Sequence, residues 1–143
     1  MEKPSKDLEK EIWESLSKEQ HVFLATAEGD QPRVRPVTLI RLKDRLYVTT
    51  GTGDAKVQQI KRNAKTEICL LLEEKGSKGT LRAECLAKLI QDKNVRNYVY
   101  RNISFSKEFW TSPEDPKFTL IELQPIAFEY MKPGTVQAIK MAL

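Results

Sequence analysis

The sequence has few of the residues that metal sites and hydrolytic active sites use most often. Its 143 residues include two cysteines, with no CxxC motif, and a single histidine, His21. A structural zinc ion takes four ligands drawn mainly from these residue types, so no metal site is predicted. The chain also has no GxSxG motif and no GxGxxG motif after a strand, which argues against a nucleophilic triad and a Rossmann site. An organic cofactor would therefore have to supply any difficult chemistry.

Long apolar runs are also missing. No run approaches the ~20 residues that a membrane helix needs, and segment 1–7 is too polar for a signal peptide. We therefore expect a cytoplasmic protein without a membrane contact. The net charge is only +4, well short of a nucleic-acid-binding tail. Cys69 and Cys85 lie in apolar strand patterns, so buried free thiols are expected rather than a disulfide.

The hydropathy pattern predicts one mainly β domain. A chain of this length buries roughly two-thirds of its unfolded surface, and it shows no internal repeat. Few helices separate the predicted strands, which favours a closed or nearly closed antiparallel barrel. Helices are predicted over 5–18 (with Ser5 as N-cap), 54–62, 92–100 and 104–110. Strands are predicted over 22–26, 33–41, 45–50, 67–72, 80–90 and 118–123, the last extended or followed by 127–131.

Two segments carry further expectations. The unbroken apolar run 68–72 predicts a strand that is buried on both faces. The tail over 133–143 is either a last short strand or unstructured.

Segment 49–56 has the composition of a phosphate-binding turn. A strand ends in Thr49 and Thr50, a glycine-broken loop follows, and Lys56 lies in the first turn of the next helix. Backbone N–H groups, hydroxyls and an ammonium group suit a phosphate. Arg35 lies on the preceding strand, which a tight turn places beside this loop. We therefore predict a phosphorylated small molecule here, while a purely structural Arg35 and a surface Lys56 remain the alternative.

Asp54 affects this prediction in two ways. As the N-cap it stabilises the start of the helix. Its carboxylate also competes with a phosphate for the same N–H groups, so a phosphate fits only if the side chain turns away.

Two other groups of residues leave alternatives open. The late aromatic residues could form a wall against a flat ring or pack the outer helices on the barrel; they are Tyr98, Tyr100, Phe105, Phe109 and Trp110. Four basic residues on the second and third strands could bind RNA or single-stranded DNA without catalysis; these are Arg33, Arg35, Arg41 and Arg45. No aromatic residues are interleaved with these arginines.

The order of these segments resembles the pyridoxamine 5′-phosphate oxidase-like FMN-binding split barrels, especially their short general-stress-protein branch. The resemblance covers roughly residues 10–131. It rests on PRVRPV at 32–37, LYVTT at 46–50, KVQQIKRN at 56–63 and DPKFTLIELQP at 115–125.

The resemblance implies a six-stranded antiparallel split barrel in a single domain over 1–143, with its core at about 20–131. It implies a homodimer with FMN in a groove between the subunits. Lys56 would hold the phosphate, and Arg82 would approach from the partner chain. The resulting set of cofactor-binding residues is Arg35, Pro36, Val37, Thr38, Thr49, Thr50, Lys56, Arg82 and Trp110; no catalytic residue is predicted.

The chain departs from the family pattern at three places. Asp54 and Cys85 stand where the family often has Ser and Gly, and a cysteine there could crowd the groove. The C-terminal extension that true pyridoxamine phosphate oxidases use on substrate is missing, so vitamin B6 synthesis is not expected. The predicted function is an FMN-dependent oxidoreductase with a small substrate. A deazaflavin protein, a haem protein (for which His21 is poorly placed as a ligand) and a non-enzymatic, stress-related flavin-binding protein are the alternatives.

Overall fold

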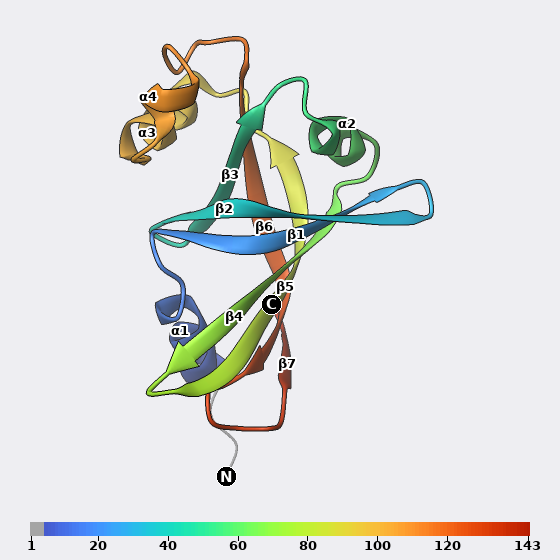
Figure 1. Ribbon diagram of the computed structural model, residues 1–143, viewed down its shortest axis with the longest axis vertical. Helices are drawn as coiled ribbons and strands as arrows, with labels where there is room; N and C mark the ends of the chain where they lie inside the picture. Colours follow the sequence, from blue (N-terminus) through green and yellow to red (C-terminus); the bar gives the residue numbers. More distant parts are fainter. Residues whose placement is uncertain (1–4) are drawn as a thin grey trace.

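The computed structural model describes residues 5–143, in which seven strands form one antiparallel sheet with helices at its two ends (Figure 1). The helices are α1 (Ser5–Glu14), α2 (Ala55–Arg62), α3 (Lys93–Asn102) and α4 (Ser106–Phe109). The strands are β1 (Glu19–Glu28), β2 (Gln31–Leu42), β3 (Arg45–Gly51), β4 (Lys65–Glu74), β5 (Ser77–Leu89), β6 (Phe118–Met131) and β7 (Ile139–Ala142). The predicted Ser5 cap concerns a side chain outside the described part of the structure.

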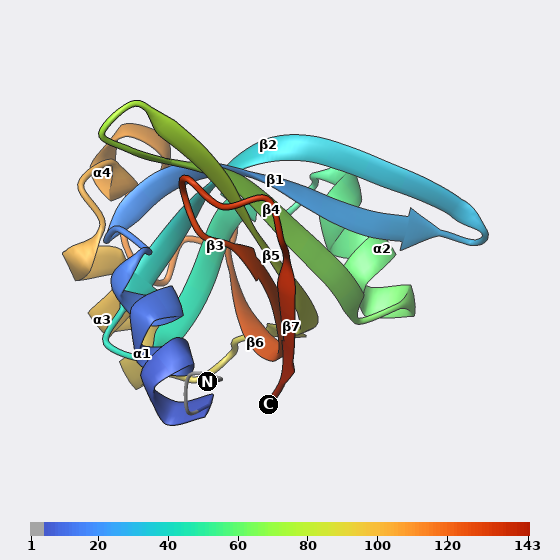
Figure 2. The same cartoon turned by 90° about the horizontal axis from the view of Figure 1, so that it is seen from below.

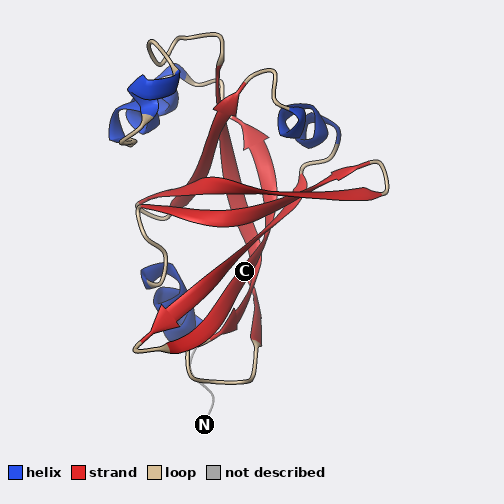
Figure 3. Ribbon diagram, viewed as in Figure 1, coloured by secondary structure: helices blue, strands red, loops and turns tan. Residues whose placement is uncertain are grey.

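Six of the strands close into a ring. They pair in the order β3-β2-β1-β4-β5-β6, and β3 pairs again with β6. The seventh strand, β7, pairs with residues 127–130 of β6, beyond the part of β6 that pairs with β3. Part of the tail therefore has a regular structure. The closed ring is visible from below in Figure 2, and Figure 3 shows how much of the chain is strand. The predicted six-stranded barrel with peripheral helices is confirmed.

Two-residue turns set the registers of three hairpins. Lys43 in the β2–β3 turn and both central residues of the β4–β5 turn, Lys75 and Gly76, have positive φ, as hairpin turns of the primed types require. The predicted pairing across the β2–β3 turn, with Ile40 opposite Tyr47, is confirmed. The β1–β2 hairpin projects past the barrel on the side of α2 (Figures 1 and 2).

β6 continues past Pro125, so of the two possibilities left open for residues 127–131 the structure shows an extension of the strand. Pro125 has no N–H for the ladder, and the register against β5 shifts there, so that Cys85 pairs with Pro125 and Glu84 with Ala127. Ile126 is the extra residue of this bulge. The proline therefore bends the strand rather than ending it.

Two apolar cores hold the elements in place. The first fills the barrel and includes Leu24, Leu39 and Phe128, with Ile12 of α1 closing one end. The second lies between the outer side of the sheet and helices α3 and α4; its members are Ile40, Leu42, Tyr47, Ile90, Val99, Tyr100, Ile103, Trp110, Phe118 and Leu120. This second core fixes the aromatic segment against the end of β3.

The outer face of β4 is open in the single chain, so the predicted burial of both faces is wrong. Alternate residues point into the barrel, but Leu71 is 75% exposed and Cys69 is half-buried. Phe23, Leu86 and Ile126 are also exposed on neighbouring strands. These exposed apolar side chains share the outer face with the charged residues Glu67, Arg82 and Glu84.

Both cysteines are free thiols, as predicted. Cys85 is buried inside the barrel, and this burial raises the pKa of its thiol to about 12. The predicted burial of Cys69 holds only in part.

None of the helices formed by residues 5–143 combines the length and apolar character needed to cross a lipid bilayer.

Candidate functional site

A groove of about 490 Å³ lies where β2, the end of β3, the start of α2 and the α4 segment meet. Its volume is in the range of small-molecule sites, and it is open to solvent rather than enclosed. The residues that line it are Pro36, Val37, Thr38, Thr49, Thr50, Gly51, Lys56, Phe105, Phe109 and Trp110. We call it the β2–β3 pocket. It brings together seven of the nine predicted cofactor-binding residues.

The polar end of this pocket is built around Lys56. The predicted surface position of Lys56 is wrong, because only 7% of the residue is exposed. The reason is that α2 turns this side chain inward, on the same face as Val57 and Ile60. The Lys56 ammonium group donates a hydrogen bond to the Thr50 hydroxyl at 2.9 Å. A buried lysine needs such partners, since an isolated buried charge is costly.

Asp54 completes this polar end. Its carboxylate lies 3.0 Å from the Lys56 ammonium group and accepts a hydrogen bond from the Thr50 hydroxyl at 3.3 Å. It makes no capping hydrogen bond to the helix. The predicted helix start is confirmed, but the carboxylate points toward Lys56 and not away from it.

The environment of Asp54 favours its charged form. Partial burial alone would raise the pKa of this carboxyl, but the hydrogen bonds and charge of Lys56, with help from Thr50, hold the pKa below its ordinary value of 3.8. The contact between Asp54 and Lys56 therefore stabilises the fold above that value, and its contribution is lost as the pH falls through the lowered pKa.

Thr49 has an unsatisfied hydroxyl at the pocket. Its Oγ1 is the one buried side-chain oxygen or nitrogen without a hydrogen-bond partner in the described part of the chain. Buried polar atoms are nearly always paired, and an exception calls for an explanation. Thr49 lines the pocket, so a bound molecule would satisfy this shielded hydroxyl once the side chain turns to another rotamer.

Trp110 packs against the barrel and also lines the pocket, so it has both of the roles that the sequence left open for the late aromatic residues. It is 7% exposed, its indole N–H donates to the Lys117 carbonyl at 3.1 Å, and its ring lies 4.9 Å from the Phe118 ring. Phe105 and Phe109 line the same wall, and Phe109 is 66% exposed. The sequence placed these two only within the aromatic cluster and did not assign them to the site.

Arg35 stands next to the pocket but outside its lining. Its guanidinium donates to the Leu24 carbonyl at 3.1 Å and to the Gln59 amide oxygen at 2.9 Å. Burial lowers the pKa of Arg35, against a raising effect of Asp54, yet an arginine stays charged in either case. Gln59, which also accepts a hydrogen bond from Thr26 at 2.5 Å, links Arg35 to α2. No pattern in the sequence indicated that this glutamine is buried.

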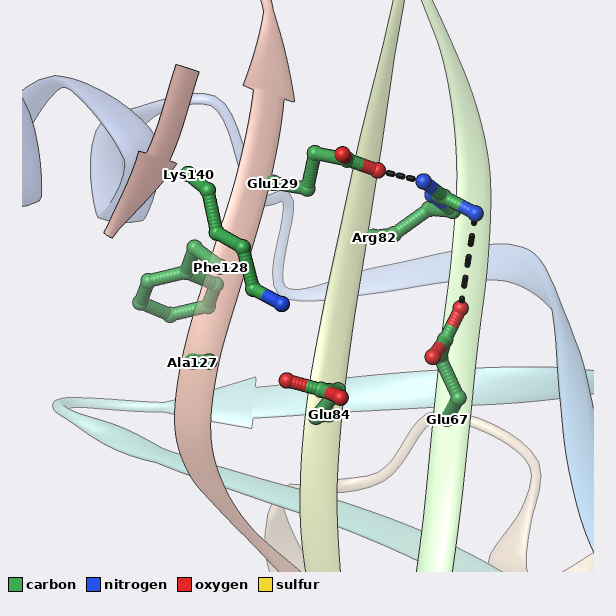
Figure 4. A pocket seen from close by; sticks show the side chains of 7 residues that line it. All are labelled: Glu67, Arg82, Glu84, Ala127, Phe128, Glu129 and Lys140. Atoms are coloured by element: carbon green, nitrogen blue, oxygen red, sulfur yellow. Dashed lines mark ion pairs between the residues drawn. The ribbon is translucent and has the colours of Figure 1, made fainter. Parts of the chain in front are cut away.

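Arg82 lies away from the pocket of its own chain. It pairs with Glu129 and lies 3.9 Å from Glu67, beside a shallow hollow on the outer face (Figure 4). In the strand register, Pro36 faces Phe23, Phe23 faces Cys69 and Cys69 faces Arg82. Three strand spacings separate Pro36 from Arg82, about 14 Å. The hollow at Arg82 has a volume of about 230 Å³, small for a cofactor.

The arginines that left nucleic-acid binding open all have partners within the chain. Arg33 pairs with Glu28 and Arg45 with Glu122, each at 2.8 Å. Arg41 donates to the carbonyl oxygen of Trp13 at 2.8 Å. With the contacts of Arg35, each of the four guanidinium groups is therefore already engaged within the chain.

Comparison with known structures supports the fold. General stress protein 26 from Bacillus anthracis is 24% identical and superposes with a TM-score of 0.74, over 95% of this chain and 98% of that chain. A pyridoxamine 5′-phosphate oxidase-related, FMN-binding protein from Nostoc punctiforme is 19% identical, with a TM-score of 0.64 over 86% of each chain. A heme binding protein from Mycobacterium smegmatis is 11% identical, with a TM-score of 0.77 over 99% of this chain and 60% of that chain.

The sequence comparisons identify the family. None of the curated proteins matches this sequence. The family model described as pyridoxamine 5′-phosphate oxidase matches residues 8–132, nearly the whole chain. It covers the barrel together with every residue that lines the β2–β3 pocket. The chain therefore belongs to the pyridoxamine 5′-phosphate oxidase family.

Proposed function

We propose that the β2–β3 pocket binds FMN between two copies of the chain, and that the protein is an oxidoreductase for a small substrate. The observation that carries this proposal is the unpaired, buried hydroxyl of Thr49 in a pocket with a cationic end and an aromatic wall. FMN has matching parts, a phosphate, a hydroxylated chain and a flat ring. Membership of the family supports the same ligand.

The lining residues divide the binding work. Lys56 and Thr50 would hold the phosphate end, where charge-assisted hydrogen bonds are strongest. Thr38 and Thr49 would offer hydroxyl groups to polar atoms of the flavin. Trp110 would pack against apolar parts of the ligand, a role for which its rigid position on Phe118 suits it. FMN, when bound, supplies hydride or electron transfer, and the protein supplies its position and surroundings.

A second copy of the chain would complete the site. The pocket is an open groove, and the wall residue Pro36 lies beside exposed Phe23 in the strand register. Leu71 and Leu86 are also exposed on this outer face, on either side of the charged residues Glu67, Arg82 and Glu84. Burying this face in a homodimer would remove apolar surface from water and would cover the groove. We keep Arg82 as a contact to the partner's cofactor, and a cytoplasmic location, as predictions.

Replacing Thr49 with valine tests the proposal. Valine has nearly the same shape and removes an unpaired buried hydroxyl, so the free energy of unfolding should stay constant or rise. The loss of one hydrogen bond to the ligand should weaken FMN binding by about 0.5–1.5 kcal/mol. FMN fluorescence quenching measures the affinity, and urea unfolding measures the stability.

Thr66→Val is the matched control. The Thr66 hydroxyl is buried and donates to the Cys85 carbonyl at 3.2 Å, outside the pocket. This variant should lose stability and keep its FMN affinity. Equal FMN affinity in wild-type protein and Thr49→Val would remove Thr49 from the site.

Haem is the second candidate ligand, because a protein of this fold is described as heme binding. A haem needs an axial ligand, and His21 lies opposite Thr38 in the β1–β2 register. His21 is exposed and is not among the lining residues, so the hydroxyl groups and Lys56 favour FMN. Titration with haemin in place of FMN separates the two ligands. If His21 ligates haem, the Soret band should shift in wild-type protein and should not shift in His21→Ala.

A further inference from the structure

The phosphate end of the β2–β3 pocket already holds an anion from the protein itself. Lys56 is the one charged residue among the ten that line the pocket. Its ammonium group is shared between the Asp54 carboxylate at 3.0 Å and the Thr50 hydroxyl at 2.9 Å. Thr50 in turn donates to Asp54 at 3.3 Å. The three groups form a closed ring, so two of the three Lys56 N–H donors and the Thr50 hydroxyl proton are already engaged.

The neighbouring cation does not replace Lys56. The Arg35 guanidinium is directed to Leu24 and Gln59, and Asp54 lies close enough to favour its charged form against the lowering effect of burial on its pKa. Two cations and one carboxylate leave a local charge of about +1. A phosphate monoester brings a charge of about −1.5 to −2 at neutral pH, and in this position it would be a direct neighbour of the Asp54 carboxylate. Like charges at this separation repel.

We propose, building on the proposed function, that Asp54 is a specificity-determining residue that acts as a built-in anion at Lys56. The pocket therefore gains little from the 5′-phosphate of a flavin and accepts riboflavin, whose terminal group is a neutral hydroxyl, about as well as FMN. The Asp54 side chain is 46% exposed, so it can turn into solvent when FMN binds, at the cost of its contacts with Lys56 and Thr50.

Parallel titrations of wild-type protein with FMN and riboflavin, read by flavin fluorescence, measure this selectivity. In wild-type protein the two dissociation constants should agree within about fivefold, the factor given by ~1 kcal/mol. Asp54→Asn keeps the size of the side chain and removes its charge, so it should bind FMN about tenfold more tightly, a gain of 1.4 kcal/mol. Its riboflavin affinity should stay the same.

Two further variants keep the test decisive. Asp54→Ser provides the same loss of charge should Asp54→Asn fold poorly. Asp30→Asn removes an exposed carboxylate at the tip of the β1–β2 hairpin and should leave both affinities unchanged. An FMN-to-riboflavin affinity ratio that is the same in wild-type protein, Asp54→Asn and Asp54→Ser would overturn the role of Asp54 and leave FMN binding intact. Binding of neither flavin to any of the proteins would overturn the proposed function and this inference together.

Discussion

Replacing Phe118 with alanine is expected to destabilise the fold by about 3–5 kcal/mol, the usual cost of emptying a core position of this size. Phe118 is 2% exposed, and its ring contacts Tyr100 at 5.5 Å, Trp110 at 4.9 Å and the Arg96 guanidinium at 4.8 Å. Removing it would leave a cavity between the sheet and helices α3 and α4. The wall of the pocket formed by Trp110 would then lose its support, so flavin binding should fall as well.

Phe109→Ala is the control for this prediction. Phe109 also lines the pocket and contacts Trp110 at 5.6 Å, but it is 66% exposed. Its removal should change the free energy of unfolding by less than ~1 kcal/mol. Urea unfolding followed by tryptophan fluorescence compares the two variants. Similar losses in both would show that α3 and α4 are not held by the second core in the way described.

The second large effect is expected from Leu71→Glu, which replaces an exposed apolar side chain on the outer face of β4 with a charge. Leu71 is 75% exposed in the single chain, so the substitution should barely affect the stability of the monomer. In a homodimer that covers this face the carboxylate would be buried without a partner, which costs several kcal/mol. The dissociation constant of the dimer should therefore rise at least a hundredfold, the factor given by ~2.7 kcal/mol.

Val136→Glu is the matched control, because Val136 is an apolar residue that is 98% exposed in the loop between β6 and β7. This variant should remain a dimer. Sedimentation velocity over a range of protein concentrations measures the dimerisation of both variants. The Leu71→Glu monomer should also bind FMN more weakly, because the partner's half of the site is gone. A Leu71→Glu protein that stays dimeric would place the interface elsewhere.

Local sequence signals were enough to predict the barrel and the polar end of the pocket, whereas other lining residues such as Pro36, Val37 and Thr38 came from the resemblance to the family. A two-residue turn at Lys43 and Asp44 fixes how β2 pairs with β3, and alternation then decides which side chains share a face. The sequence left open whether residues 127–131 extend the sixth strand past Pro125, and a bulge at this proline lets the strand continue. The resemblance to the family rests on the order of these segments along the chain.

The features that the sequence did not reveal depend on contacts between distant segments. A lysine in a short amphipathic helix normally points to solvent, and only the partners Thr50 and Asp54 explain why Lys56 is buried. Whether the Thr49 hydroxyl is paired depends on the whole neighbourhood of the pocket. The separation of Arg82 from the pocket follows from the order of strands in the ring, which single-strand patterns do not contain.

The central claim is that two copies of this chain bind FMN at the β2–β3 pocket, and one measurement tests it most directly. Purified protein is mixed with excess FMN and passed over a gel-filtration column with detection at the flavin and protein absorption bands. We expect a yellow peak at the mass of a dimer with one FMN per chain. Protein that elutes colourless and free of flavin, whatever its mass, would contradict it.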